Sequence, residues 1–283
     1  MKIGIVDAGG GYRGIYAAGV LDYCLDRGIN FDLGIGVSAG CANLGSFVSR
    51  QPRRNYRFYT EFGHRKEYAS THNFLTKKTF IDMDYVYNTL SNSDGEYPID
   101  YETFQNNTMD FVVVATDADT ALPRYFTKDQ IKQDDYSPMK ASCAIPGVCH
   151  AYDVEGRACF DGALSDPLPV QKAFDLGCDK VILLVTKPRN FIRSPERDEP
   201  LAKFIEKDYP AVAQAVRQRA RLYNEEMSMA KLHARTGKVL IVAPDDTCGV
   251  STLTRDPELL HNLYSKGYAD GHKIEEFLSK ADE

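Results

Sequence analysis

The 283-residue chain contains no tryptophan and no run of apolar residues approaching the roughly 18 that a membrane-spanning helix needs. Its formal net charge is −6 and its basic residues form no cluster, which argues against nucleic acid as a partner. The N-terminal run around Asp7 is strand-like and lacks the apolar segment of a signal peptide. These absences predict a cytoplasmic protein, and a transient contact with a membrane surface stays compatible with them.

Paired cysteines are also missing from the sequence. The seven cysteines are odd in number, are scattered along the chain and include no C-x-x-C pair. This pattern is typical of a reducing compartment, and we interpret several of the cysteines as small buried apolar residues. The sequence gives no indication of a metal site or of a cofactor.

What the sequence does contain is an alternation of strand-like and helix-like segments. Hydrophobic residues make up 43% of the chain, which is enough for a full α/β core. Such an alternation predicts one α/β domain over residues 1–283, with a mostly parallel central sheet flanked by helices. Predicted strands lie at Lys2–Asp7, Phe31–Ile35, Asp110–Ala115, Pro123–Thr127, Lys180–Thr186 and Lys238–Ala243; predicted helices lie at 15–27, 41–48, 211–236 and 257–279.

Two regions of the sequence, residues 51–108 and 187–283, contain no motif that we can assign. Residues 51–108 are rich in aromatic side chains, which either pack on the core or line a substrate cavity as a helical cap. Residues 187–200 contain three prolines and many charges, which predicts an exposed loop. The basic residues of the helix at 211–236, among them Arg217 and Arg219, are interpreted as a solvated face.

The first chemical motif is Gly36-Val37-Ser38-Ala39-Gly40, which follows a predicted strand and precedes a helix. A G-x-S-x-G turn in this context is typical of a nucleophile elbow, in which the serine hydroxyl is exposed above the edge of the sheet. The helix that begins there also favours a developing negative charge at its N-terminus. Ser38 is therefore the candidate nucleophile.

The second motif is the glycine loop Gly9–Gly14, directly after the first strand. Consecutive glycines let backbone N–H groups turn toward an anion, such as a tetrahedral oxyanion or a phosphate. Gly9, Gly11 and Gly14 also match the dinucleotide pattern G-x-G-x-x-G. That pattern needs an acidic residue at the end of the second strand, where this chain has Ser38 instead, so the nucleotide alternative is the weaker one.

The third element is the general base. A Ser-His-Asp arrangement would require one of the late histidines, His233, His261 or His272, but all three lie in predicted helices rather than in a loop after a strand. Asp161 is the better candidate, because it follows an apolar strand and precedes Gly162, at which the backbone can pass close to a second group.

Taken together, these motifs resemble those of the patatin-like phospholipases, a family of serine acyl hydrolases. The family combines a glycine loop, a G-x-S-x-G elbow and a D-G-G or D-G-A motif, which stand here in that order as Gly9–Gly14, Gly36–Gly40 and Asp161–Ala163. The segment 141–146 also fits the family pattern. The resemblance covers about residues 3–173 and implies a three-layer α/β/α core, with residues 174–283 supplying the remaining strands and C-terminal helices.

The resemblance implies a Ser38–Asp161 dyad that hydrolyses a lipid or another acyl ester. Ser38 would attack the carbonyl, Asp161 would act as general base in a partly dry site, and Gly9, Gly10 and Gly11 would form the oxyanion hole. Arg13 would steer an anionic group or brace the loop. A phosphate-binding protein and a catalytically silent scaffold stay open as alternatives. The supporting motif residues are Arg13, Gly14, Gly36, Gly40 and Gly162.

Overall fold

A computed structural model describes residues 1–196 and 198–279. In this described part, the strands form one eight-stranded sheet in the order β5-β6-β3-β2-β1-β7-β8, with β4 paired to β3 beside that path. The strands are β1 (Ile3–Asp7), β2 (Leu33–Val37), β3 (Asp110–Asp117), β4 (Pro123–Thr127), β5 (Tyr152–Val154), β6 (Arg157–Asp161), β7 (Lys180–Leu184) and β8 (Val239–Val242).

The central strands of this sheet are parallel, and its edge beyond β3 is antiparallel. Strand β1 pairs in parallel with β2 and β7, while β3 pairs in parallel with β2 and antiparallel with β4 and β6. The chain therefore moves from β1 to β2 and β3 on one side, and returns to β7 and β8 on the other. Ligands of open α/β sheets bind at the carboxyl ends of the strands where the direction reverses, which here is beside β1.

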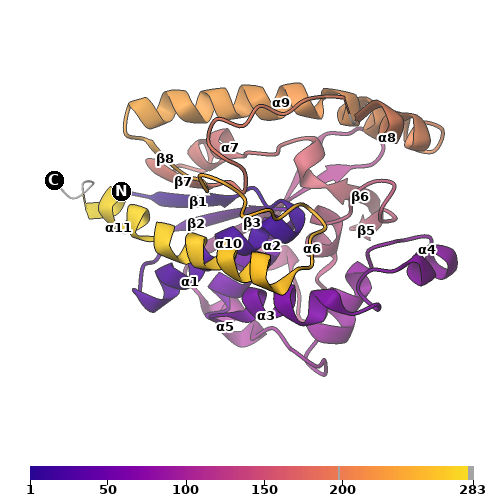
Figure 1. Cartoon of the computed structure of the whole chain (residues 1–283), viewed down its shortest axis with the longest axis horizontal. Coiled ribbons are helices and arrows are strands. Elements are labelled where there is room, and N and C mark those ends of the chain that lie inside the picture. The colour runs from indigo at the N-terminus through magenta and orange to yellow at the C-terminus, as the bar shows by residue number, and fades with distance from the viewer. Residues whose placement is uncertain (197, 280–283) are drawn as a thin grey trace.

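Helices cover both faces of the sheet (Figure 1), with α9 and α7 on one side and α1, α2 and α10 on the other. Proline at the first position and an Asp256 side-chain cap explain why α10 begins where it does. The helices are α1 (Ile15–Asp26), α2 (Ala39–Val48), α3 (Arg54–Thr60), α4 (Thr71–Lys77), α5 (Tyr101–Asn106), α6 (Ser137–Ser142), α7 (Val170–Asp175), α8 (Asp198–Ile205), α9 (Pro210–Arg235), α10 (Pro257–Asp270) and α11 (His272–Ser279).

Each face of the sheet has its own hydrophobic core. Ile5 packs into the cluster that contains the residues of α1 and α2, whereas the adjacent Val6 packs into the cluster that contains Met227 and Ala230 of α9. Successive side chains of a strand point to opposite faces, so a strand buried on both faces reads as a continuous apolar run. This explains why the central strands were predictable and confirms the α/β class with a mostly parallel sheet flanked by helices.

Several local predictions need correction. The helix predicted at 257–279 is two helices, α10 and α11, which are separated at Gly271. The loop predicted at 187–200 gives way to α8 at Asp198, whose side chain is buried rather than exposed. Five of the seven cysteines are buried and all seven are free, in agreement with their interpretation as apolar residues. The division into segments 3–173 and 174–283 stays a prediction.

Candidate active site

Ser38 stands in the sharp turn between β2 and α2. Its backbone has φ 54° and ψ −132°, a left-handed conformation that a non-glycine residue rarely adopts. The turn places Ser38 at the N-terminus of the ten-residue helix α2. It also places the residue at the carboxyl end of β2, beside the loop that follows β1. The local geometry is that of a nucleophile elbow.

The two glycines that flank Ser38 are required by close approach. A Cβ atom on Gly40 would lie 2.1 Å from the carbonyl oxygen of Asp7, and one on Gly36 would lie 2.5 Å from the Cα of Cys41. Neither position has room for a side chain, because the atoms in the way belong to the backbone. Gly40 therefore lets the elbow lie directly against the end of β1, and Gly36 lets the first turn of α2 pack closely on β2.

The glycine loop lies against this elbow. Gly9, Gly10 and Gly11 all have positive φ angles, and a Cβ on Gly9 would lie 3.0 Å from the backbone nitrogen of Ala39. In one respect the loop departs from the sequence prediction, since the N–H of Gly9 donates to Oδ1 of Asp7 at 2.9 Å and is not available for an oxyanion. The N–H groups of Gly10 and Gly11 have no acceptor among the described residues.

Asp7 is a site residue that the sequence analysis overlooked. It is fully buried, and its two carboxylate oxygens accept hydrogen bonds from Gly9 and from the side chain of Asn43, each at 2.9 Å. Burial raises the pKa of Asp7 to about 6, against the lowering effect of these two bonds. Asp7 thus ties the glycine loop to helix α2, which carries Asn43.

Asp161 stands at the end of β6, which runs antiparallel to β3. Its side chain is 5% exposed, and its Oδ1 accepts a hydrogen bond from the N–H of Ala163 at 2.9 Å. Burial raises the pKa of Asp161 to about 6, against the opposing effects of the Ala163 N–H and the Ser38 hydroxyl. Ser38 and Asp161 line the same cavity.

The segment after α6 connects the two candidate catalytic groups. The Oγ of the buried Ser142 accepts a hydrogen bond from the backbone N–H of Ser38 at 2.9 Å. Two residues later, the carbonyl of Ala144 accepts one from the backbone N–H of Asp161, also at 2.9 Å. The segment 141–146, which fits the family pattern, therefore holds the elbow and the end of β6 in a fixed relative position.

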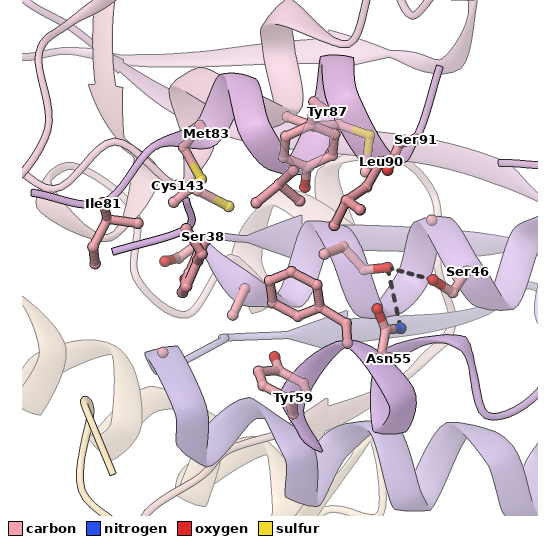
Figure 2. Close-up of a pocket in the computed structure, with 18 of the residues that line it drawn as sticks. Ser38, Ser46, Asn55, Tyr59, Ile81, Met83, Tyr87, Leu90, Ser91 and Cys143 are labelled. Carbon is pink, nitrogen blue, oxygen red and sulfur yellow. Dashed lines mark hydrogen bonds between the residues drawn. The ribbon is translucent and has the colours of Figure 1, made fainter. Parts of the chain in front are cut away.

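An apolar pocket leads away from one side of Ser38. Figure 2 shows Ser38 at one end of it and Ser46 with Asn55 at the other, where both side chains bond the carbonyl of Ala42. Most of its walls come from α2 and from residues 54–99, which confirms that aromatic residues of the cap line a cavity as well as pack on the core. Lining side chains include Phe58, Tyr59, Tyr68, Ile81, Met83, Val86, Tyr87 and Leu90.

A second pocket meets the apolar pocket at Ser38, and we call it the basic pocket. It shares Gly11, Ser38 and Thr252 with the apolar pocket and also contains Asp161. Four cationic side chains line it: Arg13, Lys187, Arg193 and Arg219. Arg13 also donates from Nη1 to the hydroxyl of Thr252 at 2.8 Å, so it braces this junction. The site therefore has one apolar arm and one arm that carries positive charge.

Arg219 differs from its sequence interpretation. It was assigned to a solvated face of the long helix α9, but its side chain is only 19% exposed and its Nε donates to Asp198 at 2.8 Å. The prediction of a solvated basic face is correct for Arg221, whose side chain is 66% exposed. Lys187 and Arg193 lie in the segment 187–200, which was predicted to be an exposed loop, and neither was predicted to be a site residue. A sequence signal for these residues is lacking, because only folding brings the segment after β7 and α9 to the carboxyl edge of the sheet.

The histidines lie elsewhere. All six are among the described residues, and none of them lines either pocket. His233 packs its ring against Phe174, His261 contacts the hydroxyl of Tyr56 at 3.0 Å, and His272 bonds the carbonyl of Ala269 at 2.7 Å. Among the described residues, the cavity at Ser38 thus contains the carboxyl group of Asp161 and no imidazole. No group of three or more His, Cys, Asp or Glu residues in the described chain is arranged to hold a metal ion.

Two family models match the chain. The model described as patatin-like phospholipase matches residues 5–174, and a domain of unknown function (DUF6363) matches residues 209–281. The first match spans more than half of the chain and includes all three sequence motifs.

Curated relatives agree with this match. The uncharacterized protein YjjU of Escherichia coli is 30% identical over 200 residues, which cover 69% of this chain and 55% of YjjU. Lysophospholipase nte1 of Aspergillus fumigatus and its counterpart in Neosartorya fischeri are each 25% identical over 186 residues, 63% of this chain and 11% of the relative. The chain thus spans about half of YjjU and about a tenth of nte1. Among solved structures, VipD from Legionella pneumophila matches with a TM-score of 0.49 and 13% identity, over 96% of this chain and 66% of VipD.

Proposed function

Since this chain belongs to the patatin-like phospholipase family, we propose that it is a serine acyl hydrolase that cleaves lipid esters with a Ser38–Asp161 dyad. The observation that carries the proposal is the junction at Ser38. A strained serine at a helix N-terminus, a buried carboxyl and a glycine loop meet where the apolar pocket and the basic pocket join. The apolar pocket suits an acyl chain, and the opposite arm suits the alcohol part of an ester.

The proposed reaction proceeds through an acyl-enzyme. The Oγ of Ser38 attacks the ester carbonyl carbon as its proton passes to Asp161, and the N–H groups of Gly10 and Gly11 hold the oxyanion. The bond to the alcohol oxygen then breaks, and the alcohol leaves with the proton from Asp161. Water attacks the acyl-enzyme, again giving a proton to Asp161, and the fatty acid leaves as Ser38 recovers that proton.

The surroundings of Asp161 support its role as base. A carboxyl with an ordinary pKa is a weak base, whereas burial raises the pKa of this one to about 6. The carboxylate form still predominates at neutral pH, so the group is both available and more basic than usual. Asp161 needs no third residue to orient it, because the N–H of Ala163 fixes one carboxylate oxygen.

The first test is covalent labelling with a fluorophosphonate probe, with the modified peptide identified by mass spectrometry. We expect the label on Ser38, and we expect Asp161→Asn to lower labelling and ester turnover by about 10²–10⁴-fold. Asp153→Asn, at an exposed position of strand β5, is the matched control and should retain both.

Two outcomes would contradict the proposal. Full activity in Asp161→Asn together with loss in a His233, His261 or His272 variant would indicate a Ser-His-Asp enzyme. No label on a folded wild-type protein, combined with phosphate binding that survives Ser38→Ala, would favour the phosphate-binding alternative. Circular dichroism on each variant separates a chemical effect from unfolding.

A further inference from the structure

Among the described residues, the protein neutralises the cations of the basic pocket only in part, with Arg219 paired closely to Asp198. Neither Arg13 nor Lys187 has a carboxylate within 4.0 Å among the described residues. The Nε atoms of Arg13 and Arg193 are buried and have no hydrogen-bond partner there. Buried N–H donors are costly when they lack an acceptor, so such an arrangement indicates that an acceptor arrives with a ligand.

These side chains also repel one another. Burial lowers the pKa of Lys187, and the charges of Arg13 and Arg193 lower it further. Burial likewise lowers the pKa of Arg193, with Arg219 adding to the effect. Asp198 offsets part of this charge, since it pairs with Arg219 and lies 3.7 Å from Arg193. A cluster of like charges that the protein does not neutralise is stabilised by a bound anion.

The balance of charge in the pocket indicates how much negative charge that anion carries. Four cations line the pocket, whereas among the described residues the carboxylates near them are Asp198 and Asp161. An excess of two positive charges therefore remains even when Asp161 is ionised. A phosphate monoester carries a charge of about −1.5 to −2 at neutral pH and offers three acceptor oxygens, so it matches both the charge and the free donors.

We propose that Arg13, Lys187 and Arg193 form a phosphate subsite, which binds a phosphate monoester on the alcohol part of the acyl ester. The inference rests on the proposed function, and it names the substrate class of the same site. Because the subsite and the apolar pocket meet at Ser38, an ester carbonyl at the serine would have its acyl chain on one side and its phosphate on the other.

The same geometry disfavours a choline head group. A quaternary ammonium would add a further positive charge to a pocket that already holds four cations, and the ring of Phe191 in this pocket is already covered by the Nζ of Lys187, 4.8 Å from its centroid. A choline phosphodiester also has no net charge, so it cannot neutralise the excess. The subsite therefore distinguishes phosphorylated alcohols from zwitterionic ones.

The experiment compares three substrates that share one acyl chain: 1-acylglycerol 3-phosphate, 1-acylglycerophosphocholine and 1-monoacylglycerol. For the wild-type protein we expect kcat/KM to be at least about tenfold higher for the phosphate monoester than for the other two. In Arg193→Gln and in Lys187→Gln, the ratio of phosphate monoester to monoacylglycerol should fall about 10- to 100-fold. Arg221→Gln, on the exposed side of α9, is the matched control and should leave the ratio unchanged.

Equal or higher kcat/KM for the choline ester, abolished by Ser38→Ala, would overturn the phosphate subsite while the proposed hydrolase stands. No turnover of any ester, with no label on Ser38, would overturn the hydrolase instead. The subsite is then tested by calorimetric titration of the full chain with sn-glycerol 3-phosphate and with inorganic phosphate. Binding of glycerol phosphate that is lost in Arg193→Gln would support the subsite. Equally tight binding of inorganic phosphate would identify free phosphate as the ligand. Absence of binding of either compound would overturn the subsite.

Discussion

The two arms of the site differ in how they hold their cations: Arg54 is buried, whereas the side chain of Arg193 is 34% exposed. Arg54 lies at the wall of the apolar pocket, where its Nη1 and Nη2 donate to the carbonyl of Pro98 and the hydroxyl of Ser91, each at 3.0 Å. Its guanidinium also stacks on Tyr97, 4.6 Å from the ring centroid. Arg193 in the basic pocket keeps a buried Nε without a partner among the described residues.

This difference separates a cation that stabilises the fold from a cation that is available to bind a ligand. A cation that leaves no buried donor without a partner, as Arg54 does among the described residues, belongs to the scaffold, and its removal leaves carbonyl and hydroxyl acceptors without partners. A cation with free donors in a cavity is available for a ligand, and its removal costs the fold little. The apolar pocket therefore presents an apolar surface to a ligand although Arg54 lies in its wall. In the basic pocket, the cationic side chains line the cavity itself.

The largest effect on activity is expected from a charge placed in the apolar pocket. Val86 lines that pocket, and Val86→Glu would force a carboxylate either to desolvate or to displace the acyl chain. We expect kcat/KM for a long-chain ester to fall about 100-fold, and Val86→Leu, which keeps the apolar surface, to fall far less. Equal losses in the two variants would mean that shape rather than polarity governs this arm.

A smaller effect separates the two arginines by stability. We expect Arg54→Met to lower the free energy of unfolding by about 2–4 kcal/mol, because Pro98 and Ser91 lose their buried partner. Arg193→Gln should change the free energy of unfolding by less than about 1 kcal/mol, since it removes a desolvated charge from among like charges. Urea titration of both variants measures the difference. A large loss in Arg193→Gln would make that side chain structural.

The smallest expected effect is on the pH profile of turnover. Asp161 must be ionised to accept the serine proton, so kcat/KM should rise with pH and reach half of its plateau near the raised pKa of about 6. Arg193 lowers this pKa through its charge. Arg193→Gln should therefore move the midpoint to higher pH by less than about one unit, and Val86→Leu in the other arm should leave it in place. A midpoint that moves down in Arg193→Gln would contradict the proposed base.

The α/β core and the motifs were predictable from local sequence. Strands buried on both faces give continuous apolar runs, and β1 and β2 could be identified in this way together with the turns that follow them. Ser38 was recognisable because a tight strand-to-helix turn requires glycine at Gly36 and Gly40, and this requirement leaves a pattern five residues long. Such features depend on neighbours in the chain, so the sequence alone determined them.

The specificity of the two arms was decided by tertiary structure. Arg13 and Arg193 are 180 positions apart in the chain, yet both line the basic pocket, because the strands β1 and β7 that precede them are adjacent in the sheet. Arg219 could not be told from Arg221 by sequence, since only the packing of α8 on α9 buries one and exposes the other. The charge and burial of a cavity depend on segments that are far apart in the chain, so a local sequence pattern does not reveal them.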